Sequence, residues 1–176
     1  MRDHLPILFI DIDGVMLRRR HLGMFDAFEL APNCLEFLEW ATAWFRCRWL
    51  SSRCRQGFLD GSRRAFRAAG APLDDPRWAV LNLIEPAAWS ANKIEAIDPI
   101  SDFWWIDDNP TERDRAWLRN HNREDRLIEA SSDRDPDALL AARAVLGARS
   151  ILKTQQDDNA HHGEPTGPHK LTYKCR

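Results

Sequence analysis

Short apolar runs alternate along this chain with segments of helical periodicity. The run at 7–10 is continuously apolar and leads into Asp11, as expected of a strand buried on both faces of a parallel sheet. Similar runs predict further strands over 47–50, 78–84, 103–106 and 126–129. Apolar residues at roughly helical spacing predict helices over 32–45, 58–69, 90–97, 111–120 and 136–146. This alternation predicts a three-layer α/β/α sandwich around a central, Rossmann-like parallel sheet.

Residues 1–148 are predicted to form this one domain, and 149–176 a disordered polar tail. The chain has 176 residues, of which 44% are apolar and 30% charged, and this suits one globular domain with a real core. After about residue 148 the sequence becomes rich in polar residues. Residues 18–30 lack clear periodicity and predict a loop or flap. The interval 16–31 is too short for a second folded domain, and 57–90 is filled by one predicted helix and one predicted strand with their connections, so a single domain is expected.

Charge and cysteine usage exclude several classes of function. The formal net charge is −2, so no global excess of charge points to nucleic acid or to an anionic membrane. No long uncharged apolar run is present, and acids interrupt the apolar start, which predicts neither a transmembrane helix nor a signal peptide. The four cysteines lack metal-site spacing and are interpreted as reduced thiols: Cys34, Cys47, Cys54 and Cys175. We therefore expect a cytoplasmic protein without a membrane partner.

The carboxyl ends of the predicted strands carry polar side chains. The first strand ends in the sequence DIDGV at 11–15, the second in two serines at 51–52, and the strand at 103–106 in DDNP at 107–110. Lys93 belongs to the helix predicted just before that last strand. Ligands of open α/β sheets bind beyond the carboxyl ends of the strands. The sequence therefore predicts that four carboxylates, one or two hydroxyls and one ammonium group converge at one edge.

Lys93 stands out because this chain fills its basic positions with arginine. There are 21 arginines and four lysines, and Lys93 is the one lysine before residue 150. A lone lysine among arginines indicates a position that needs the compact charge of an ammonium group rather than the planar guanidinium of arginine. Ser90 is the expected N-cap, which places Lys93 in a first helical turn, where a nearby anion would offset the unfavourable helix dipole.

This ordered set of motifs resembles the haloacid-dehalogenase (HAD) superfamily of phosphohydrolases, in its small type without a cap. The match consists of a strand followed by Asp-x-Asp-Gly-Val, a strand followed by serine, a lysine, and a strand followed by Asp-Asp. It spans residues 7–110. The physical chemistry agrees, since several carboxylates at one site require a proton or a cation, and a hard divalent cation with oxygen ligands suits Mg²⁺.

The resemblance implies a role for each motif residue. Asp11 would be the nucleophile that forms an aspartyl-phosphate, and Asp13 the acid and base that serves the leaving group and then water. Ser51 would bind a phosphoryl oxygen, with Ser52 as the alternative, and Lys93 would neutralise charge. The metal ligands implied are Asp11, the backbone carbonyl of Asp13, and Asp107, with Asp108 as a ligand or an outer partner. The implied reaction is Mg²⁺-dependent hydrolysis of a phosphomonoester.

Each motif also has an ordinary structural interpretation. The acidic motifs at 11–14 and 107–110 can be strand exits and turns, either serine at 51–52 can cap a helix, and Lys93 can be a surface residue. The domain could be a non-catalytic binding module, because a fold does not guarantee a function. A phospho-accepting receiver domain also combines acidic residues with a lysine. In such a domain the acid pair follows the first strand and the lysine comes after the phospho-accepting strand. Here the second acid pair follows Lys93, which argues against a receiver domain.

The substrate class is the part that the sequence predicts least directly. A site without a cap is open to a phosphate on a large molecule, and we favour a phosphorylated nucleic-acid end or a nucleotide over a phosphoprotein or a small metabolite. Arginine forks suit phosphate backbones. The arginines expected to flank the site are Arg18, Arg19, Arg20, Arg53 and Arg55.

Two further patterns are interpreted as structural. Cys47 and Arg53 have the spacing of cysteine-dependent phosphatases, but the segment between them lacks the glycine that a phosphate-cradling loop needs, so Cys47 is interpreted as a strand residue. Trp104 and Trp105 are expected to fill the core on opposite faces of the sheet.

Overall fold

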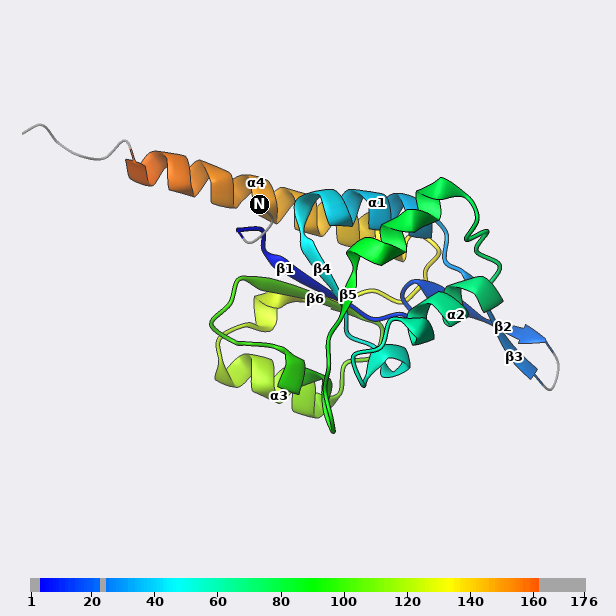
Figure 1. The fold of residues 1–176 in the computed structure, drawn as a ribbon. Helices are drawn as coiled ribbons and strands as arrows, with labels where there is room; N and C mark the ends of the chain where they lie inside the picture. Colours follow the sequence, from blue (N-terminus) through cyan, green and yellow to red (C-terminus); the bar gives the residue numbers. More distant parts are fainter. Residues whose placement is uncertain (1–3, 23–24, 162–176) are drawn as a thin grey trace, which may run out of the picture. The chain divides into compact units, whose positions relative to one another are not determined.

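The computed structural model describes residues 4–22 and 25–161 (Figure 1). The strands are β1 (Ile7–Ile10), β2 (Leu17–Leu22), β3 (Phe25–Leu30), β4 (Arg46–Trp49), β5 (Glu85–Pro86), β6 (Phe103–Asp107) and β7 (Leu127–Glu129). The α-helices are α1 (Cys34–Trp44), α2 (Asp60–Ala68), α3 (Glu112–Asn120) and α4 (Ala138–His161). Short 3-10 helices cover Ser52–Cys54, Pro76–Leu83, Lys93–Ala96 and Glu124–Arg126. The described residues up to Arg143 form one compact unit, and those from Ala144 onwards form a second.

Five parallel strands form the central sheet in the order β5-β4-β1-β6-β7. Strand β1 lies in the middle, with Ile10 beside Trp49 of β4 on one side and Ile106 of β6 on the other. Helix α1 covers one face of the sheet and α3 the other (Figure 1). This arrangement confirms the predicted α/β sandwich with a Rossmann-like sheet.

The face of the sheet beneath α3 is packed by alternate strand residues. Phe9 of β1 and Phe103 and Trp105 of β6 are buried there together with Leu118 of α3. The rings of Phe9 and Phe103 meet edge to face with centroids 6.2 Å apart. Because side chains alternate along a strand, the residues at 11 and 107, two positions after Phe9 and Trp105, continue the same face.

A chain of aromatic rings joins β4 to the segments that follow it. The centroids of Trp49 and Phe66 lie 5.6 Å apart, and those of Phe66 and Trp78 lie 5.9 Å apart. All three side chains are buried. Trp104 and Trp105 are buried as well, as expected of neighbouring residues in a strand that is covered on both faces.

The segment at 18–30, predicted as a loop or flap, is a two-stranded antiparallel hairpin of β2 and β3. Arg18 lies directly across from Glu29 in the register, and its Nε donates to the Glu29 carboxylate at 2.5 Å. Such cross-strand pairs stabilise short strands that bury little apolar surface. The hairpin lacks a clean apolar alternation, and for this reason its periodicity did not predict strands.

The strand predicted over 78–84 is wrong, because a 3-10 helix occupies Pro76–Leu83. Asp75 caps this helix by accepting from the backbone N–H of Arg77 at 2.9 Å, and proline suits its first position. Only the two-residue strand β5 follows. A short apolar run is ambiguous between strand and helix, and the Asp-Pro start decides it here.

Two predicted helices have different bounds. The helix predicted over 90–97 is a 3-10 helix over Lys93–Ala96 that is capped by Asn92, not by Ser90. The helix predicted over 136–146 is α4, which continues to His161 and so enters the segment for which we expect a disordered tail. Residues 162–176 of that segment lie outside the described residues. None of the described helices is long and apolar enough to cross a membrane.

Helix α2 packs closely against the loop that follows β4. A Cβ atom added at Gly61 would lie 1.8 Å from the backbone carbonyl oxygen of Arg53, so only glycine fits at this position. This close approach holds the first turn of α2 against the 3-10 helix at Ser52–Cys54.

Gly61→Ala is therefore expected to lower the free energy of unfolding by about 1–3 kcal/mol, the usual cost of overpacking. At an open helical position the same change would stabilise the protein by about 0.5–1 kcal/mol, so the expected sign is reversed. Urea unfolding of both proteins measures the difference. Ala68→Gly, at an exposed position of the same helix, serves as the reference for helix propensity alone. A gain in stability for Gly61→Ala would contradict the close contact.

Candidate functional site

The candidate site lies where the direction of chain winding changes. From β1 the chain continues through β4 to β5 on one side of the sheet, and then crosses to β6 and β7 on the other. Helices α1 and α3 cover opposite faces at this point (Figure 1). In open α/β sheets such a switch point leaves a crevice at the carboxyl ends of the two neighbouring strands, and this is the usual ligand site.

Three carboxylates meet at this switch point. Asp11 follows β1, and Asp107 and Asp108 lie at the end of β6, and one oxygen from each lies within 4.8 Å of the others. Asp11 and Asp107 are buried, and Asp108 is half-buried. This cluster could hold a metal ion, and it contains three of the four predicted acidic residues.

Lys93 lies between two of these carboxylates. Its Nζ donates to Oδ2 of Asp11, and to Oδ2 of Asp107 at 2.6 Å. The ammonium comes from the 3-10 helix that packs on the same face of the sheet as Phe9 and Trp105. The structure therefore places the Lys93 ammonium at the carboxyl ends of β1 and β6, where the sequence analysis expected it.

The segment before Lys93 is held in place by one carboxylate, that of Glu95. This carboxylate accepts from the Ser90 hydroxyl at 2.6 Å and from the backbone N–H groups of Ser90, Ala91 and Asn92 at 2.9–3.2 Å. Bonds from the Ser90 hydroxyl and from these N–H groups lower the pKa of Glu95 to about 2. Glu95 is a positioning residue that the motif analysis missed, although an asparagine followed three positions later by glutamate is a helix-start pattern.

Asp107 is oriented by its own strand and by the turn that follows. The indole Nε1 of Trp105 donates to Oδ2 of Asp107 at 3.2 Å, and the backbone N–H of Asn109 donates to Oδ1 at 3.0 Å. Residues two apart in a strand share a face, so the sequence could have paired Trp105 with Asp107. We missed this role because Trp105 was assigned to the core alone.

Burial shapes the electrostatics of the cluster. Burial raises the pKa of Asp11 to about 6, with a further contribution from Asp107, and Lys93 opposes the rise. Burial also raises the pKa of Asp108, again with Asp107 adding to the effect. For Lys93 burial disfavours the charged form, but the neighbouring carboxylates of Asp11 and Asp107 outweigh it and raise its pKa. When all four groups are ionised, the three carboxylates and the ammonium carry a formal charge of −2.

Gly14 brings the backbone after Asp13 next to this cluster. Its φ of +77° lies in the left-handed region that favours glycine, and an added Cβ would lie 2.2 Å from Oδ2 of Asp108. The carbonyl oxygen of Gly14 also accepts from the backbone N–H of Ser132 at 2.8 Å. A side chain at position 14 would displace the Asp108 carboxylate. This steric constraint explains why the DIDGV motif has glycine at this position.

Asp13 is not a member of the carboxylate cluster but is paired with Arg53. The guanidinium Nε donates to both oxygens of Asp13, at 2.8 and 2.9 Å, and Nη2 lies 2.7 Å from Oδ1. The guanidinium also lies over the ring of Phe28 on β3, 4.9 Å from the centroid. Arg53 was expected beside the site as a phosphate contact; the structure places it on the candidate acid instead.

The two serines after β4 differ in their surroundings. Ser51 is fully buried, and its hydroxyl has no hydrogen-bond partner within the described part of the chain. Ser52 is exposed. A buried hydroxyl without a partner is uncommon in proteins and calls for an explanation, such as a bound ligand. This difference favours Ser51 over Ser52 as a ligand contact.

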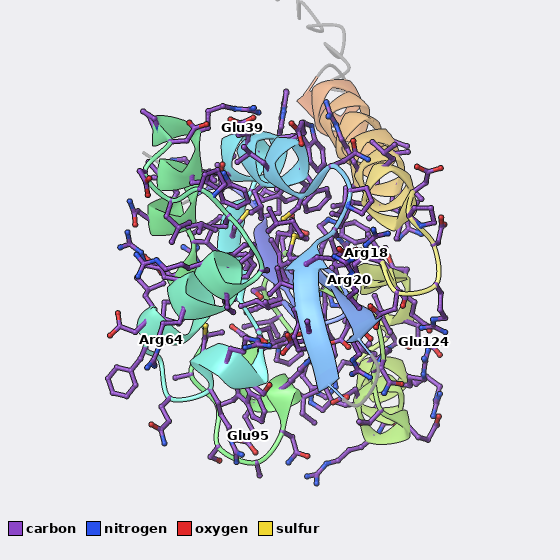
Figure 2. All side chains as sticks on the ribbon, turned by 90° about the vertical axis from the view of Figure 1, so that its right-hand side faces the viewer. Arg18, Arg20, Glu39, Arg64, Glu95 and Glu124 are labelled. Atoms are coloured by element: carbon purple, nitrogen blue, oxygen red, sulfur yellow. The ribbon has the colours of Figure 1, made fainter. Side chains whose placement is uncertain are left out.

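The hairpin arginines do not form a free basic surface. Arg18 and Arg20 both pair with Glu29, at 2.5 and 3.7 Å. The guanidinium of Arg19 lies 3.9 Å from Asp133, to which its backbone N–H also donates. Figure 2 shows Arg18 and Arg20 on one side of the hairpin, and Arg64 of α2 on the other. Their charges are thus partly neutralised within the fold.

Comparisons with known proteins add no assignment. No family model matches the chain, and a search of curated proteins finds no match either. The resemblance to the HAD superfamily therefore rests on the motif residues and on their arrangement at the switch point.

Lys93→Met is expected to destabilise the protein more at pH 8 than at pH 5. Asp11 has an ordinary pKa of 3.8 when unfolded and about 6 when folded, so stability falls as pH rises through this interval. Removing the ammonium raises the folded pKa further and extends the fall to higher pH. At pH 8 two buried carboxylates lose their partner, which costs about 3 kcal/mol; at pH 5 Asp11 is protonated and the loss is smaller.

Urea unfolding in the presence of a chelator at both pH values measures this difference. Arg115→Met is the matched control, because it removes a cation from the exposed pair with Glu129 and should cost less than about 1 kcal/mol at either pH. Equal losses for Lys93→Met at pH 5 and pH 8 would contradict the electrostatic coupling.

Proposed function

We propose that this protein is a Mg²⁺-dependent phosphomonoester hydrolase of the HAD type that acts through an aspartyl-phosphate on Asp11. The observation that carries the proposal is the position of Lys93, whose ammonium lies between Asp11 and Asp107 at the switch point of the sheet. A buried carboxylate beside a fixed cation and two further carboxylates has the parts that phosphoryl transfer needs.

The donor set of the cluster fits a hard divalent cation. Asp11, Asp107 and Asp108 offer carboxylate oxygens, the ligands that Mg²⁺ prefers, and three protein ligands suit an ion that usually keeps several waters. Two uncompensated negative charges remain after Lys93 is counted, and one divalent cation would balance them. When bound, Mg²⁺ supplies positive charge that allows a phosphate dianion to approach the Asp11 carboxylate.

Asp11 is the nucleophile in the first step. The backbone N–H of Ile12 donates to its Oδ1 at 2.7 Å and Lys93 holds its Oδ2, so the carboxylate is fixed before substrate binds. A carboxylate oxygen of Asp11 bonds to phosphorus while the bond from phosphorus to the ester oxygen breaks. The leaving alkoxide takes a proton from Asp13, which is the role expected of an acid two residues after the nucleophile.

Water completes the reaction in the second step. Asp13, now a carboxylate, accepts a proton from water as the water oxygen bonds to phosphorus. The bond between phosphorus and Asp11 breaks, which releases inorganic phosphate and restores both carboxyl groups. The buried Ser51 hydroxyl is suited to donate to a phosphoryl oxygen during both steps.

The pairing of Arg53 with Asp13 has a consequence for this mechanism. Three short contacts with Arg53 hold the Asp13 carboxylate in place and occupy both of its oxygens. A phosphate dianion is a strong competitor for the same guanidinium fork. We infer that Arg53 moves from Asp13 to the substrate phosphate, which leaves the Asp13 carboxyl group free to face the leaving group.

Asp11→Asn is expected to abolish phosphate release from p-nitrophenyl phosphate, because the amide cannot act as the nucleophile. Excess chelator should have the same effect on the parent protein. Asp74→Asn is the matched control. Asp74 is exposed and lies in the segment that follows α2, so this variant should retain full activity.

Three outcomes would contradict the proposal in different ways. Full activity of Asp11→Asn or of the chelated protein would exclude this mechanism. No phosphate release by the parent from any of a panel of phosphomonoesters would favour a binding module. A stable phosphoprotein without turnover, detected as added mass on Asp11, would favour a receiver-like acceptor.

Arg53→Ala is expected to lower kcat/KM for p-nitrophenyl phosphate by about tenfold or more, the usual effect of losing charged hydrogen bonds to a substrate. The main change should be in KM, since the guanidinium binds the phosphate in both ground and transition states. Arg18→Ala, which removes a cation paired with Glu29, serves as the control and should change little. An unchanged KM for Arg53→Ala would leave Arg53 with a purely structural role.

A further inference from the structure

Four arginines on α2 and in the loop before it form no ion pair with described residues; of these, Arg55 was expected from the sequence to flank the site, and the three on α2 were not. Arg63, Arg64 and Arg67 of α2 are exposed, and Arg55 is exposed in the loop before the helix. Within the part of the chain that the structure describes, no ion pair is formed by any of these four residues. We call this group the α2 arginine surface.

The geometry of α2 presents its three arginines together. At 100° per residue, Arg63, Arg64 and Arg67 fall within an arc of about 100°. The opposite side of the helix is buried through Ser62, Ala65 and Phe66.

One acid, Asp60, lies on the exposed side of the helix. The Nε of Arg64 donates to the backbone carbonyl oxygen of Asp60 at 3.2 Å rather than to its carboxylate. The helix therefore keeps an excess of positive charge on the side that faces solvent.

Helix α2 is joined to the candidate site through Arg53. The close contact of Gly61 with the backbone of Arg53 holds α2 against the loop whose Arg53 side chain reaches Asp13. Figure 2 shows Arg64 on the side of the β2–β3 hairpin away from Arg18 and Arg20. A long anionic molecule with one end in the site would therefore pass over α2 and not over the paired arginines of β2.

Aromatic side chains accompany the charge. Phe58 precedes α2 and is 66% exposed, which is unusual for a ring of this size. The guanidinium of Arg55 lies over the ring of Trp89, 4.7 Å from the centroid. A Cβ atom at Gly57 would contact Ala88 at 3.6 Å, so the loops that carry Phe58 and Trp89 lie side by side.

We propose that the α2 arginine surface and Phe58 bind a single-stranded polynucleotide that presents a terminal phosphate to the candidate site. Arg63 and Arg67 lie one helical turn apart, separated by a rise of about 6 Å, so they present two guanidinium groups along the same face of α2. Guanidinium forks bind backbone phosphates, and an exposed ring stacks on a base. An acidic polypeptide offers the charges but no bases for Phe58. The placement of the terminal phosphate in the candidate site rests on the proposed phosphatase function. Binding of the polynucleotide to the α2 arginine surface is independent of that function.

Binding of a fluorescein-labelled, twelve-nucleotide single-stranded DNA without terminal phosphate tests the surface independently of catalysis. Fluorescence anisotropy is measured in a chelator at 50–200 mM salt. The triple variant Arg63→Ala, Arg64→Ala, Arg67→Ala should bind about tenfold or more weakly at the lowest salt concentration. Its salt slope should fall by about 2, since each phosphate contact on a single strand contributes about 0.7.

A second triple variant serves as the matched control. Arg77→Ala, Arg115→Ala and Arg119→Ala remove the same charge, but from arginines paired with Glu39, Glu129 and Glu112, and binding should stay close to that of the parent. Equal losses in both triple variants would mean that bulk charge drives binding, and would overturn the proposal. Absence of binding by the parent, or equal competition by polyglutamate, would overturn it as well.

Phe58→Ala separates stacking from charge. This variant should bind about fivefold or more weakly with an unchanged salt slope, because the ring carries no charge. Trp44→Ala, at another exposed aromatic residue, should have no effect. If the two aromatic variants bind alike, no base stacks on Phe58. Phosphate release from p-nitrophenyl phosphate, measured on the same proteins, reports separately on the proposed activity.

Discussion

The ion pairs of Lys93 are the interaction on which the rest of the site depends. Two buried carboxylates at neighbouring strand ends repel each other, and burial alone would favour their neutral forms. The ammonium offsets both effects, and it is itself kept charged by the same carboxylates. Removing Lys93 would leave both buried carboxylates without this cation, so the ammonium is the group on which the arrangement depends.

The fold supports this arrangement through rigid elements rather than through loops alone. Asp11 and Asp107 share a face with Phe9 and Trp105, whose packing fixes the two strands. Five hydrogen-bond donors from residues 90–92 bind the Glu95 carboxylate and hold the Lys93 segment in place. A charged site of this kind needs such support, because small displacements of one charge change the energy of all the others.

The β2–β3 hairpin and α2 both contact Arg53, the residue that is paired with the candidate acid. The β2–β3 hairpin carries Phe28 over Arg53, and α2 approaches the same residue from its backbone side. Arg53 thus joins the candidate acid, the hairpin and α2. A change in any of these contacts would therefore alter the position of the Asp13 carboxylate.

Periodicity and motif order were sufficient to predict the α/β class, the parallel sheet and the acidic strand ends. They succeeded because a buried parallel strand must be apolar, and because its carboxyl end is the one place where polar side chains can gather. They failed where local chemistry outweighs periodicity. The capping Asp75-Pro76 pair turned an apolar run into a 3-10 helix, and Arg18 and Glu29 stabilised strands without an apolar pattern.

The sequence by itself determined which residue types are available for chemistry: the acids at 11, 13, 107 and 108, Ser51 and the lone Lys93. Only the tertiary structure decided how they are paired. It separated Asp13 from the carboxylate cluster by placing Arg53 upon it, and it neutralised the hairpin arginines while leaving those of α2 without ion pairs in the described chain. Charge pairing depends on distances between segments far apart in the chain, which no local pattern contains.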